Sequence, residues 1–281
     1  MENFVFTGWN IQQTATEIKL AQNSYIDKIE LEDLACLTEG SENSAILDEE
    51  KQSKFRRAVG LVGWITQVSR PEYSFIVTAM ATRYGKATLE DAKKVMRVLN
   101  KLNENEGFLT YRSLGDLEKV MIKLYCDGSY GKLNGHQSVT GTVSFLEGYE
   151  NASVVDWSSK KLAVPVKSAL AAEAEAASDA YGKAMFLKAL YEDMTGVKNV
   201  QITIVTDSNS LKQNVESDNL CKDKRTAISV SILREAKEQG HISIEWTEGK
   251  HQLADIFIKD SVNPIPLRKV LQEGRILKED M

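Results

Sequence analysis

The chain has 281 residues, of which 42% are hydrophobic and 27% are charged, and its formal net charge is −5. This balance is ordinary for a globular protein and excludes an intrinsically disordered chain. It also excludes a surface covered in phosphate-binding positive charge, although a local basic groove remains compatible with it.

Three widely spaced cysteines, Cys36, Cys126 and Cys221, form neither a CxxC pair nor a disulfide framework, which favours a reducing compartment. The N-terminal residues MENFVFTGWN lack the basic stretch and apolar run of a signal peptide. No apolar stretch reaches the roughly 18 residues of a membrane span. We therefore expect an intracellular protein, cytoplasmic or nuclear, with no membrane partner; the sequence carries no signal for oligomeric state.

The first part of the chain is predicted to be mainly helical after a small hairpin. Residues 1–21 alternate apolar and polar side chains around a polar turn, which predicts two short strands. Residues 36–52 are polar and acidic and are expected to form a surface loop. Residues 55–103 repeat apolar side chains at helical spacing, with Pro71 beginning a new helix. Residues 103–118 would be a connector.

The period of the apolar side chains changes after residue 119. Val120 to Cys126 alternate and predict a strand that ends at Asp127-Gly128. The elements expected after it are strands at 139–146 and 152–157, a long helix at 170–191, a strand at 200–206, helices at 208–215 and 222–239, a strand at 241–246 and a last helix at 250–259. Three hairpin-linked strands followed by alternating helices and strands predict a mixed five-stranded sheet with helices on both faces, an α/β fold.

Four acidic residues stand at informative places in this order. Asp127 and Asp207 follow the first and fourth strands, which can lie adjacent and parallel, and Glu173 and Asp255 lie in the long and last helices. Sites in open α/β sheets form beyond strand ends. Clustered carboxylates suit Mg²⁺ or Mn²⁺, and two such ions can activate a water and stabilise the leaving oxygen of a phosphodiester.

Each acid also has a purely structural interpretation. Asp127-Gly128 is a good turn dipeptide. Asp207 can cap the helix that begins at Ser208. Glu173 can be an acid in the first turn of its helix, where the helix dipole stabilises negative charge. Asp255 can pair with Lys259, four positions on, at a helix surface.

Glu175 competes with Glu173 for the inward position. Two residues turn about 200° around a helix, so the two side chains face different ways. Glu175 shares a polar stripe with Asp179 and Lys183, whereas Glu173 lies on the side of Ala176, Ala177, Ala180 and Ala184. We expect Glu173 to face the sheet.

Four segments, in order, resemble those of the copia-type LTR retrotransposon Pol polyprotein. They are Trp157 to Lys161 (WSSKK), the helix from Ser168 (SALAAEAEAASDA), Val205 to Leu211 (VTDSNSL) and Gln252 to Lys259 (QLADIFIK). The last is the most specific. Upstream, FRRAVGLVGWI at 55–65 and SRPEY at 69–73 resemble the region between polymerase and RNase H, and residues 6–29 resemble the end of the polymerase palm.

The resemblance implies an RNase H-like domain at 119–260, after a reverse-transcriptase thumb or connection-like segment at 1–118 and before a C-terminal tail at 261–281. Its implied activity is hydrolysis of the RNA strand of RNA–DNA hybrids with two Mg²⁺ ions, which Mn²⁺ can replace. The implied catalytic and metal-binding residues are Asp127, Glu173, Asp207 and Asp255. His251 would be auxiliary, in product release or proton transfer; a capping role is the alternative.

The chain departs from the polyprotein where polymerisation would occur. No Asp-Asp pair is present, so the Tyr-x-Asp-Asp motif of the polymerase is absent and the chain should not polymerise DNA. The catalytic palm would lie upstream of Met1, and this polymerase part of a parent polyprotein is an expected partner.

The helix at 222–239 carries cations that can bind the phosphates of the hybrid: Lys222, Lys224, Arg225 and Arg234. A solvated charged face is the alternative for these residues. For the whole chain there are two other readings: a catalytically silent retrotransposon remnant that binds nucleic acid or a partner, and a phosphatase or other metal hydrolase using the same acids.

Overall fold

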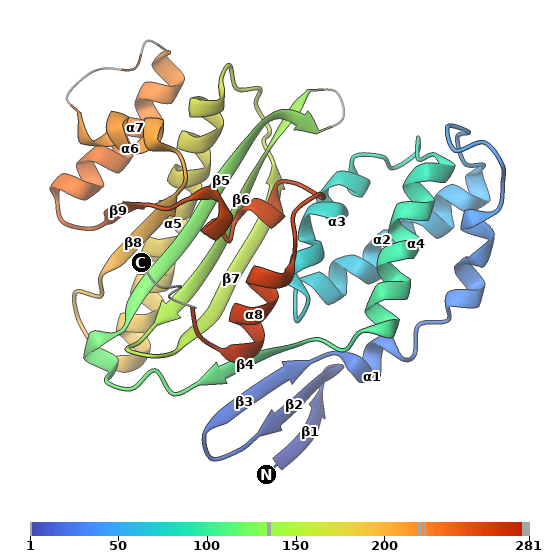
Figure 1. Cartoon of the computed structure of the whole chain (residues 1–281), viewed down its shortest axis with the longest axis horizontal. Helices are drawn as coiled ribbons and strands as arrows, with labels where there is room; N and C mark the ends of the chain where they lie inside the picture. The colour runs from blue at the N-terminus through green and yellow to red at the C-terminus, as the bar shows by residue number, and fades with distance from the viewer. Residues whose placement is uncertain (1, 134–135, 218–220, 222, 277–281) are drawn as a thin grey trace. The chain divides into compact units, whose positions relative to one another are not determined.

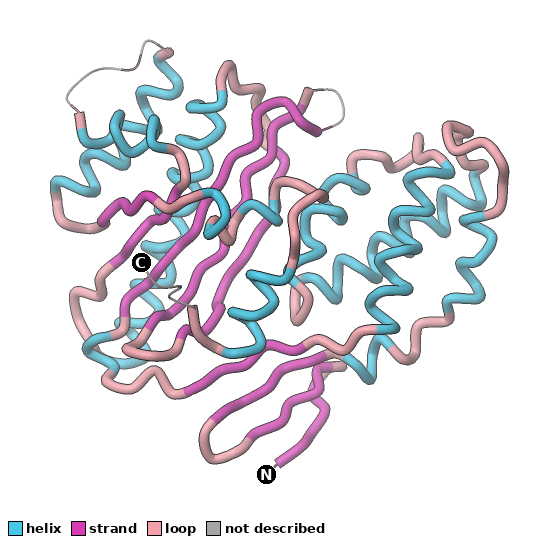
Figure 2. The backbone as a smooth tube through the Cα atoms, in the orientation of Figure 1, coloured by secondary structure: helices cyan, strands magenta, loops and turns pink. Residues whose placement is uncertain are grey.

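The computed structural model describes residues 2–133, 136–217, 221 and 223–276. The chain forms two compact units, Met1–Thr110 and Tyr111–Met281. None of the helices in these described stretches is long and apolar enough to cross a membrane. Figures 1 and 2 trace both units, and each unit is described by itself below.

The first unit combines a small sheet with a helical cluster. Its sheet has the order β1-β2-β3-β4, with antiparallel pairing of β1 with β2 and of β2 with β3. The strands are β1 (Glu2–Phe6), β2 (Trp9–Gln13), β3 (Glu17–Ala21) and β4 (Phe108–Arg112), and the helices are α1 (Asn23–Ile26), η1 (Leu31–Thr38), α2 (Glu49–Thr66), η2 (Pro71–Tyr73), α3 (Ser74–Ala81) and α4 (Leu89–Glu104).

Polar caps fix where the two long helices of this unit begin. The Asp48 side chain accepts a hydrogen bond from Lys51 N at the start of α2. Thr88 and Asp91 form a reciprocal capping box at the start of α4. The fully buried Phe55 and Leu99 then place the apolar faces of α2 and α4 in the core.

The second unit is built on a mixed five-stranded sheet of order β7-β6-β5-β8-β9. The central strand β5 pairs antiparallel with β6 and parallel with β8, and β9 is parallel to β8. The strands are β5 (Met121–Leu133), β6 (Gln137–Glu147), β7 (Ala152–Lys161), β8 (Ile202–Thr206) and β9 (Ser243–Trp246). The mixed five-stranded sheet and the parallel neighbours β5 and β8 expected from the sequence are confirmed.

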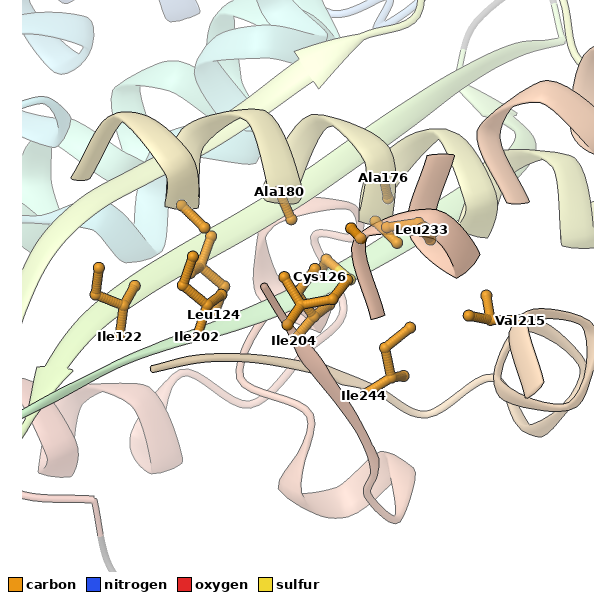
Figure 3. Packing of buried hydrophobic residues seen from close by; sticks show 14 of the residues in the cluster. Ile122, Leu124, Cys126, Ala176, Ala180, Ile202, Ile204, Val215, Leu233 and Ile244 are labelled. Carbon is orange, nitrogen blue, oxygen red and sulfur yellow. The ribbon is translucent and has the colours of Figure 1, made fainter. Parts of the chain in front are cut away.

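One face of this sheet packs on α5 (Ala169–Thr195), with α6 (Asn209–Glu216) and α7 (Lys224–Glu238) beside it. Ala176 and Ala180 of α5 face Ile122, Leu124 and Cys126, as Figure 3 shows. Small side chains let a helix lie close to a sheet, so the Ala-rich sequence of α5 fixes its distance from β5. The opposite face carries α8 (Ile265–Glu273), which contacts β7, and η5 (Asp255–Phe257), which contacts β6. Figure 1 shows these coverings on both faces.

The predicted helix at 250–259 is wrong. The segment contains two short 3₁₀ turns, η4 (Gly249–His251) and η5. Leu253, Ala254, Ile256, Phe257 and Ile258 are all buried. An α-helix lying on a sheet buries one stripe, whereas six of the seven side chains from Gln252 to Ile258 are buried, so this segment is better served by an irregular path.

Other boundaries also differ from the sequence prediction. The strand expected to end at Asp127-Gly128 continues to Leu133, because β6 pairs with it beyond Asp127. The hairpin at 1–21 has three strands, and the connector at 103–118 contains β4 and a 3₁₀ turn, η3 (Leu117–Lys119). The segment 261–281, expected as a tail, contains α8, and the Gly274 carbonyl accepts a hydrogen bond from Ala152 N.

Candidate metal centre and its surroundings

Asp127 lies within the central strand, opposite Gly141 of β6, and is only 3% exposed. Its Oδ1 accepts a hydrogen bond from Gly128 N at 2.7 Å. A Cβ on Gly128 would lie 2.4 Å from the carbonyl carbon and oxygen of Ala172. Glycine at 128 therefore allows the first turn of α5 to pack against β5, and this contact carries the next residue, Glu173, to Asp127.

Glu173, not Glu175, joins the carboxylates at this point. The Ser168 side chain caps α5 by accepting a hydrogen bond from Ala171 N, which fixes the start of the helix. Glu175 instead accepts a hydrogen bond from Ser229 Oγ at 3.0 Å. The helix phase expected for Glu173 agrees with the structure. The solvated stripe expected for Glu175 and Asp179 is observed only in part: Glu175 contacts Ser229 of α7, whereas Asp179 forms a surface ion pair with Lys160.

Asp207 directly follows β8, the parallel neighbour of β5. The cap of α6 is the Ser208 side chain, which accepts a hydrogen bond from Leu211 N, so Asp207 is not used as the cap. One carboxylate oxygen from each of Asp127, Glu173 and Asp207 lies within 4.8 Å of the other two. Three elements distant in sequence thus place three acids in one small volume.

Asp255 reaches this group from the opposite face of the sheet. Its Oδ1 accepts a hydrogen bond from Lys259 Nζ at 2.5 Å, and the same Nζ lies 4.0 Å from Asp127 Oδ2. The Gln252 side chain holds the segment to the central strand: its Nε2 donates to the Cys126 carbonyl at 3.0 Å, and its Oε1 accepts from Ala254 N. Asp255 therefore lies beside Asp127 without belonging to the compact group of three.

The electrostatics of these acids reflect burial and mutual repulsion. Burial, the neighbouring Asp255 and then Glu173 and Asp207 raise the pKa of Asp127 far above its ordinary value. Burial also raises the pKa of Glu173 to about 7. Burial and the charge of Asp255 raise the pKa of Asp207. Burial alone would raise the pKa of Asp255, but its hydrogen bond with Asp127 and the Lys259 ammonium hold that pKa below its usual range.

Two buried oxygens in this cluster are left without a donor. With the acids ionised, Asp127 Oδ2 and Glu173 Oε2 are buried and accept no hydrogen bond. A neighbouring carboxyl group can donate a hydrogen bond to these two oxygens only if it is protonated. The raised pKa values of Asp127 and Glu173 reflect this preference for the protonated form. A divalent cation satisfies the same oxygens without protons. The donor set is all oxygen, which fits Mg²⁺ or Mn²⁺.

The four cations expected to bind phosphate have different surroundings. Lys222 lies outside the described residues. Lys224 and Arg225 are exposed at the start of α7 and line a surface pocket of about 290 Å³ together with Lys167. Arg234 is half-buried, and its Nη2 donates to the Asn214 carbonyl at 2.8 Å, so it ties α7 to the end of α6.

His251 is half-buried in η4, where its backbone N–H donates to the Glu248 carbonyl. It is not one turn of α-helix before Asp255, since the intervening residues are not α-helical. The segment nevertheless runs beside the acids, because a Cβ on Gly249 would lie 3.6 Å from Asp207 Oδ2.

Sequence reasoning missed two residues that organise this centre. The sequence motif at 252–259 includes Gln252 but predicts no role for it. Lys259 is predicted only to pair with Asp255 on a helix surface. A polar residue within a run of buried apolar ones is the available signal for Gln252. The proximity of Lys259 to Asp127 carries no such signal, because it depends on how the segment crosses the sheet.

No protein-family model and no curated protein matches the chain. Solved structures similar to it include the N-terminal RNase H domain of rv2228c from Mycobacterium tuberculosis, at 15% identity and a TM-score of 0.38 over 50% of this chain and 93% of that one. RNase H1 from the archaeon Halobacterium salinarum is 16% identical, with a TM-score of 0.35 over 54% of this chain and 98% of that one.

The foamy viral protease-reverse transcriptase, solved with an RNA/DNA hybrid, is also similar. It is 13% identical with a TM-score of 0.47, and the match covers 88% of this chain but 29% of the viral one. Similarities this distant say nothing about the chemistry of the chain, which has to follow from its own residues.

Proposed function

We propose that the chain is an endoribonuclease of the RNase H type, which hydrolyses the RNA strand of RNA–DNA hybrids with divalent metal ions. The observation that carries the proposal is the group of Asp127, Glu173 and Asp207, in which two buried carboxylate oxygens have no hydrogen-bond donor. Buried polar atoms are normally satisfied, so unsatisfied ones in a cluster of acids favour a bound cation.

Asp127, Glu173 and Asp207 would hold one Mg²⁺ ion, and Asp127 with Asp255 would hold a second. Bound there, the ions would generate a hydroxide nucleophile and stabilise the leaving oxygen of a phosphodiester. Asp127 would be the shared ligand, which agrees with its central place in the sheet.

The surrounding chain would keep this arrangement rigid. Gly128 seats the start of α5 on β5, and Gln252 fixes the segment that carries Asp255 to the same strand. Ligands held by packed elements lose little freedom when the transition state forms, which is the main protein contribution to such catalysis.

The substrate proposal rests on the resemblance of the sequence motifs and on the placement of cations. Lys224 and Arg225 are exposed and could bind phosphates of either strand, which gives affinity without base specificity. An RNA strand would be distinguished by its 2′-hydroxyls.

His251 would assist product release. We also propose a copia-type origin, intracellular action and cooperation with a polymerase part of the same polyprotein.

A strand-specific cleavage assay tests this function. The full chain would be incubated with a hybrid labelled on either its RNA or its DNA strand, with double-stranded DNA, and with a small phosphate ester, each in EDTA, Mg²⁺ or Mn²⁺. We expect internal cleavage of the RNA strand in either metal and none in EDTA. Hydrolysis of the small ester alone would point to a phosphatase, and cleavage in EDTA would exclude the metal chemistry.

A further inference from the structure

The ammonium group of Lys259 lies next to two carboxylates of the acidic cluster, those of Asp255 and Asp127. Its Nζ is 2.5 Å from Asp255 Oδ1 and 4.0 Å from Asp127 Oδ2. The three side chains are 31%, 20% and 5% exposed, respectively. The contact is therefore shielded from solvent much more than a surface ion pair.

Buried neighbouring residues fix the position of the Lys259 backbone next to the acidic cluster. The three preceding residues, Ile256, Phe257 and Ile258, are buried, and Gly141 of β6 provides the space for Phe257 and Ile258. The Cα atom of Lys259 is thereby held close to the site. Its ammonium has a favourable position next to two carboxylates that repel each other.

The ammonium of Lys259 occupies the side of Asp255 that would face the proposed second metal ion. A divalent ion between Asp127 and Asp255 would be repelled by the ammonium of Lys259, which lies next to both carboxylates, so the two cations compete for the same negative charge. The group of three acids is affected less, because Lys259 Nζ is 4.0 Å from Asp127 Oδ2, beyond hydrogen-bond distance, and Asp127 Oδ2 and Glu173 Oε2 have no donor. The two halves of the site consequently differ: one has free oxygens, and the other already holds a cation of the chain itself.

We infer that Lys259 is a built-in counter-cation, which holds Asp255 beside Asp127 in the metal-free protein and has to leave Asp255 when a divalent ion binds between these two acids. This inference rests on the proposed function. It makes ion binding sequential: the group of three acids fills first, and the Asp127–Asp255 position fills more weakly because the ion competes with the ammonium.

An ordinary i,i+4 ion pair without any task in metal binding is the competing explanation. The chain offers a matched control for it. Lys188 and Glu192 of α5 form an i,i+4 pair at 3.8 Å, with both side chains 19% exposed. Neither residue of this pair belongs to the acidic cluster.

The test measures metal affinity and metal-free stability in the full chain. Mn²⁺ binding would be followed by isothermal titration and melting in EDTA by calorimetry, for the parent, Lys259→Met, Lys259→Arg and Lys188→Met. We expect Lys259→Met to bind its weaker Mn²⁺ ion about tenfold more tightly, which is the scale of one lost charge-assisted hydrogen bond. Its melting temperature in EDTA should fall by about 2–4 °C. Lys259→Arg and Lys188→Met should bind Mn²⁺ as the parent does.

A measurement on the unsubstituted protein covers the case in which Lys259→Met does not fold. Saturating Mn²⁺ should speed the reductive methylation of Lys259, followed by mass spectrometry, and leave that of Lys188 unchanged. If the parent binds Mn²⁺ but neither the affinity of Lys259→Met nor the methylation of Lys259 changes, the inference is overturned and the proposed function stands. If no form of the protein binds Mn²⁺, the proposed function fails and the inference falls with it.

Discussion

Among the single residues of the candidate site, Asp127 is the most deeply buried acid, and its burial depends on contacts from several segments of the chain. Asp127 and Asp207 follow from strand ends, and Glu173 from the turn of a helix. The exposure of Asp127, 3%, depends on contacts from Gly128, Gly141 and the 252–258 segment. The contact with the 252–258 segment joins positions more than a hundred residues apart, and no local pattern encodes it.

Substituting Glu173 and Glu175 of α5, one at a time, separates a metal ligand from a structural residue. Glu173→Gln should lower the rate of hybrid cleavage about 100-fold or more, since losing a ligand should cost at least what losing its supporting partner does. Glu175→Gln should change the rate less than about threefold, because the amide can still accept a hydrogen bond from Ser229 Oγ. Steady-state cleavage assays compare the two variants, and the reverse ranking would mean that the site is wrongly assigned.

The raised pKa of Glu173 predicts how metal-free stability depends on pH. The folded state holds this proton up to about pH 7, whereas the unfolded chain releases it near 4.5. Between these values the folded state binds more protons, so the free energy of unfolding should fall as pH rises. The raised pKa values of Asp127 and Asp207 act in the same direction.

Urea unfolding in EDTA at pH 5, 6 and 7, followed by circular dichroism, measures this dependence. Saturating Mn²⁺ should flatten it, because the ion replaces the protons, and Glu173→Gln should reduce it without metal. A stability that is constant or rises over this range in EDTA would show that the acids are not buried together as described.

At the scale of elements, the regular parts of the fold were predictable and the irregular ones were not. The alternating apolar side chains of β5 correctly predict a strand there, and the Ala-rich run correctly predicts the helix α5. The parallel pairing of β5 with β8 was also expected. The segment 250–259 was expected to be a helix, but six of its seven side chains from Gln252 to Ile258 are buried. Its path is set by Gln252 binding the Cys126 carbonyl and by the space at Gly141, both of which are tertiary contacts.

The close approach at Gly141 predicts a specific loss of stability. A Cβ at this position would lie 2.7 Å from Phe257 Cβ and 2.9 Å from the Ala254 carbonyl oxygen. Gly141→Ala should therefore destabilise the protein by about 1–3 kcal/mol through overpacking. It should also weaken Mn²⁺ binding, because the displaced segment carries Asp255.

Gly182→Ala is the matched control for this prediction. Gly182 lies within α5, and a Cβ there meets no atom within 4 Å. The change should stabilise the protein by about 0.5–1 kcal/mol, the difference between glycine and alanine in a helix. Thermal melting of both variants checks the pair, and an unchanged melting temperature for Gly141→Ala would refute the packing described for the 252–258 segment.

At the scale of the whole molecule, the chain divides into two compact units at residues 110 and 111. The change of apolar period near residue 119 indicates such a division in the sequence. The strand Phe108–Arg112 could not be anticipated, since its pairing with β3 joins residues far apart in the chain. All four acids lie in the second unit, so its fold is sufficient to assemble the candidate site.

A fragment of residues 111–281 should therefore fold by itself. The central sheet, α5 and the acids all belong to this unit, and its core includes fully buried side chains such as Ile122, Leu124 and Ile204. We expect a single cooperative thermal transition and Mn²⁺ binding within about threefold of the full chain. Calorimetry and titration of the fragment measure both, and a fragment without a cooperative transition would show that the first unit is required for folding.

The most direct test of the central claim compares cleavage of a labelled RNA–DNA hybrid by the parent and by Asp127→Asn. The substitution keeps the shape of the side chain but removes the ligand shared by both proposed ions, and it relieves repulsion among the acids, so it should not unfold the protein. We predict cleavage of the RNA strand by the parent in Mg²⁺ or Mn²⁺ and none by Asp127→Asn, with an equal or higher melting temperature for the variant in EDTA. Cleavage by a folded Asp127→Asn at the parental rate, or no cleavage by a folded parent in either metal, would contradict it.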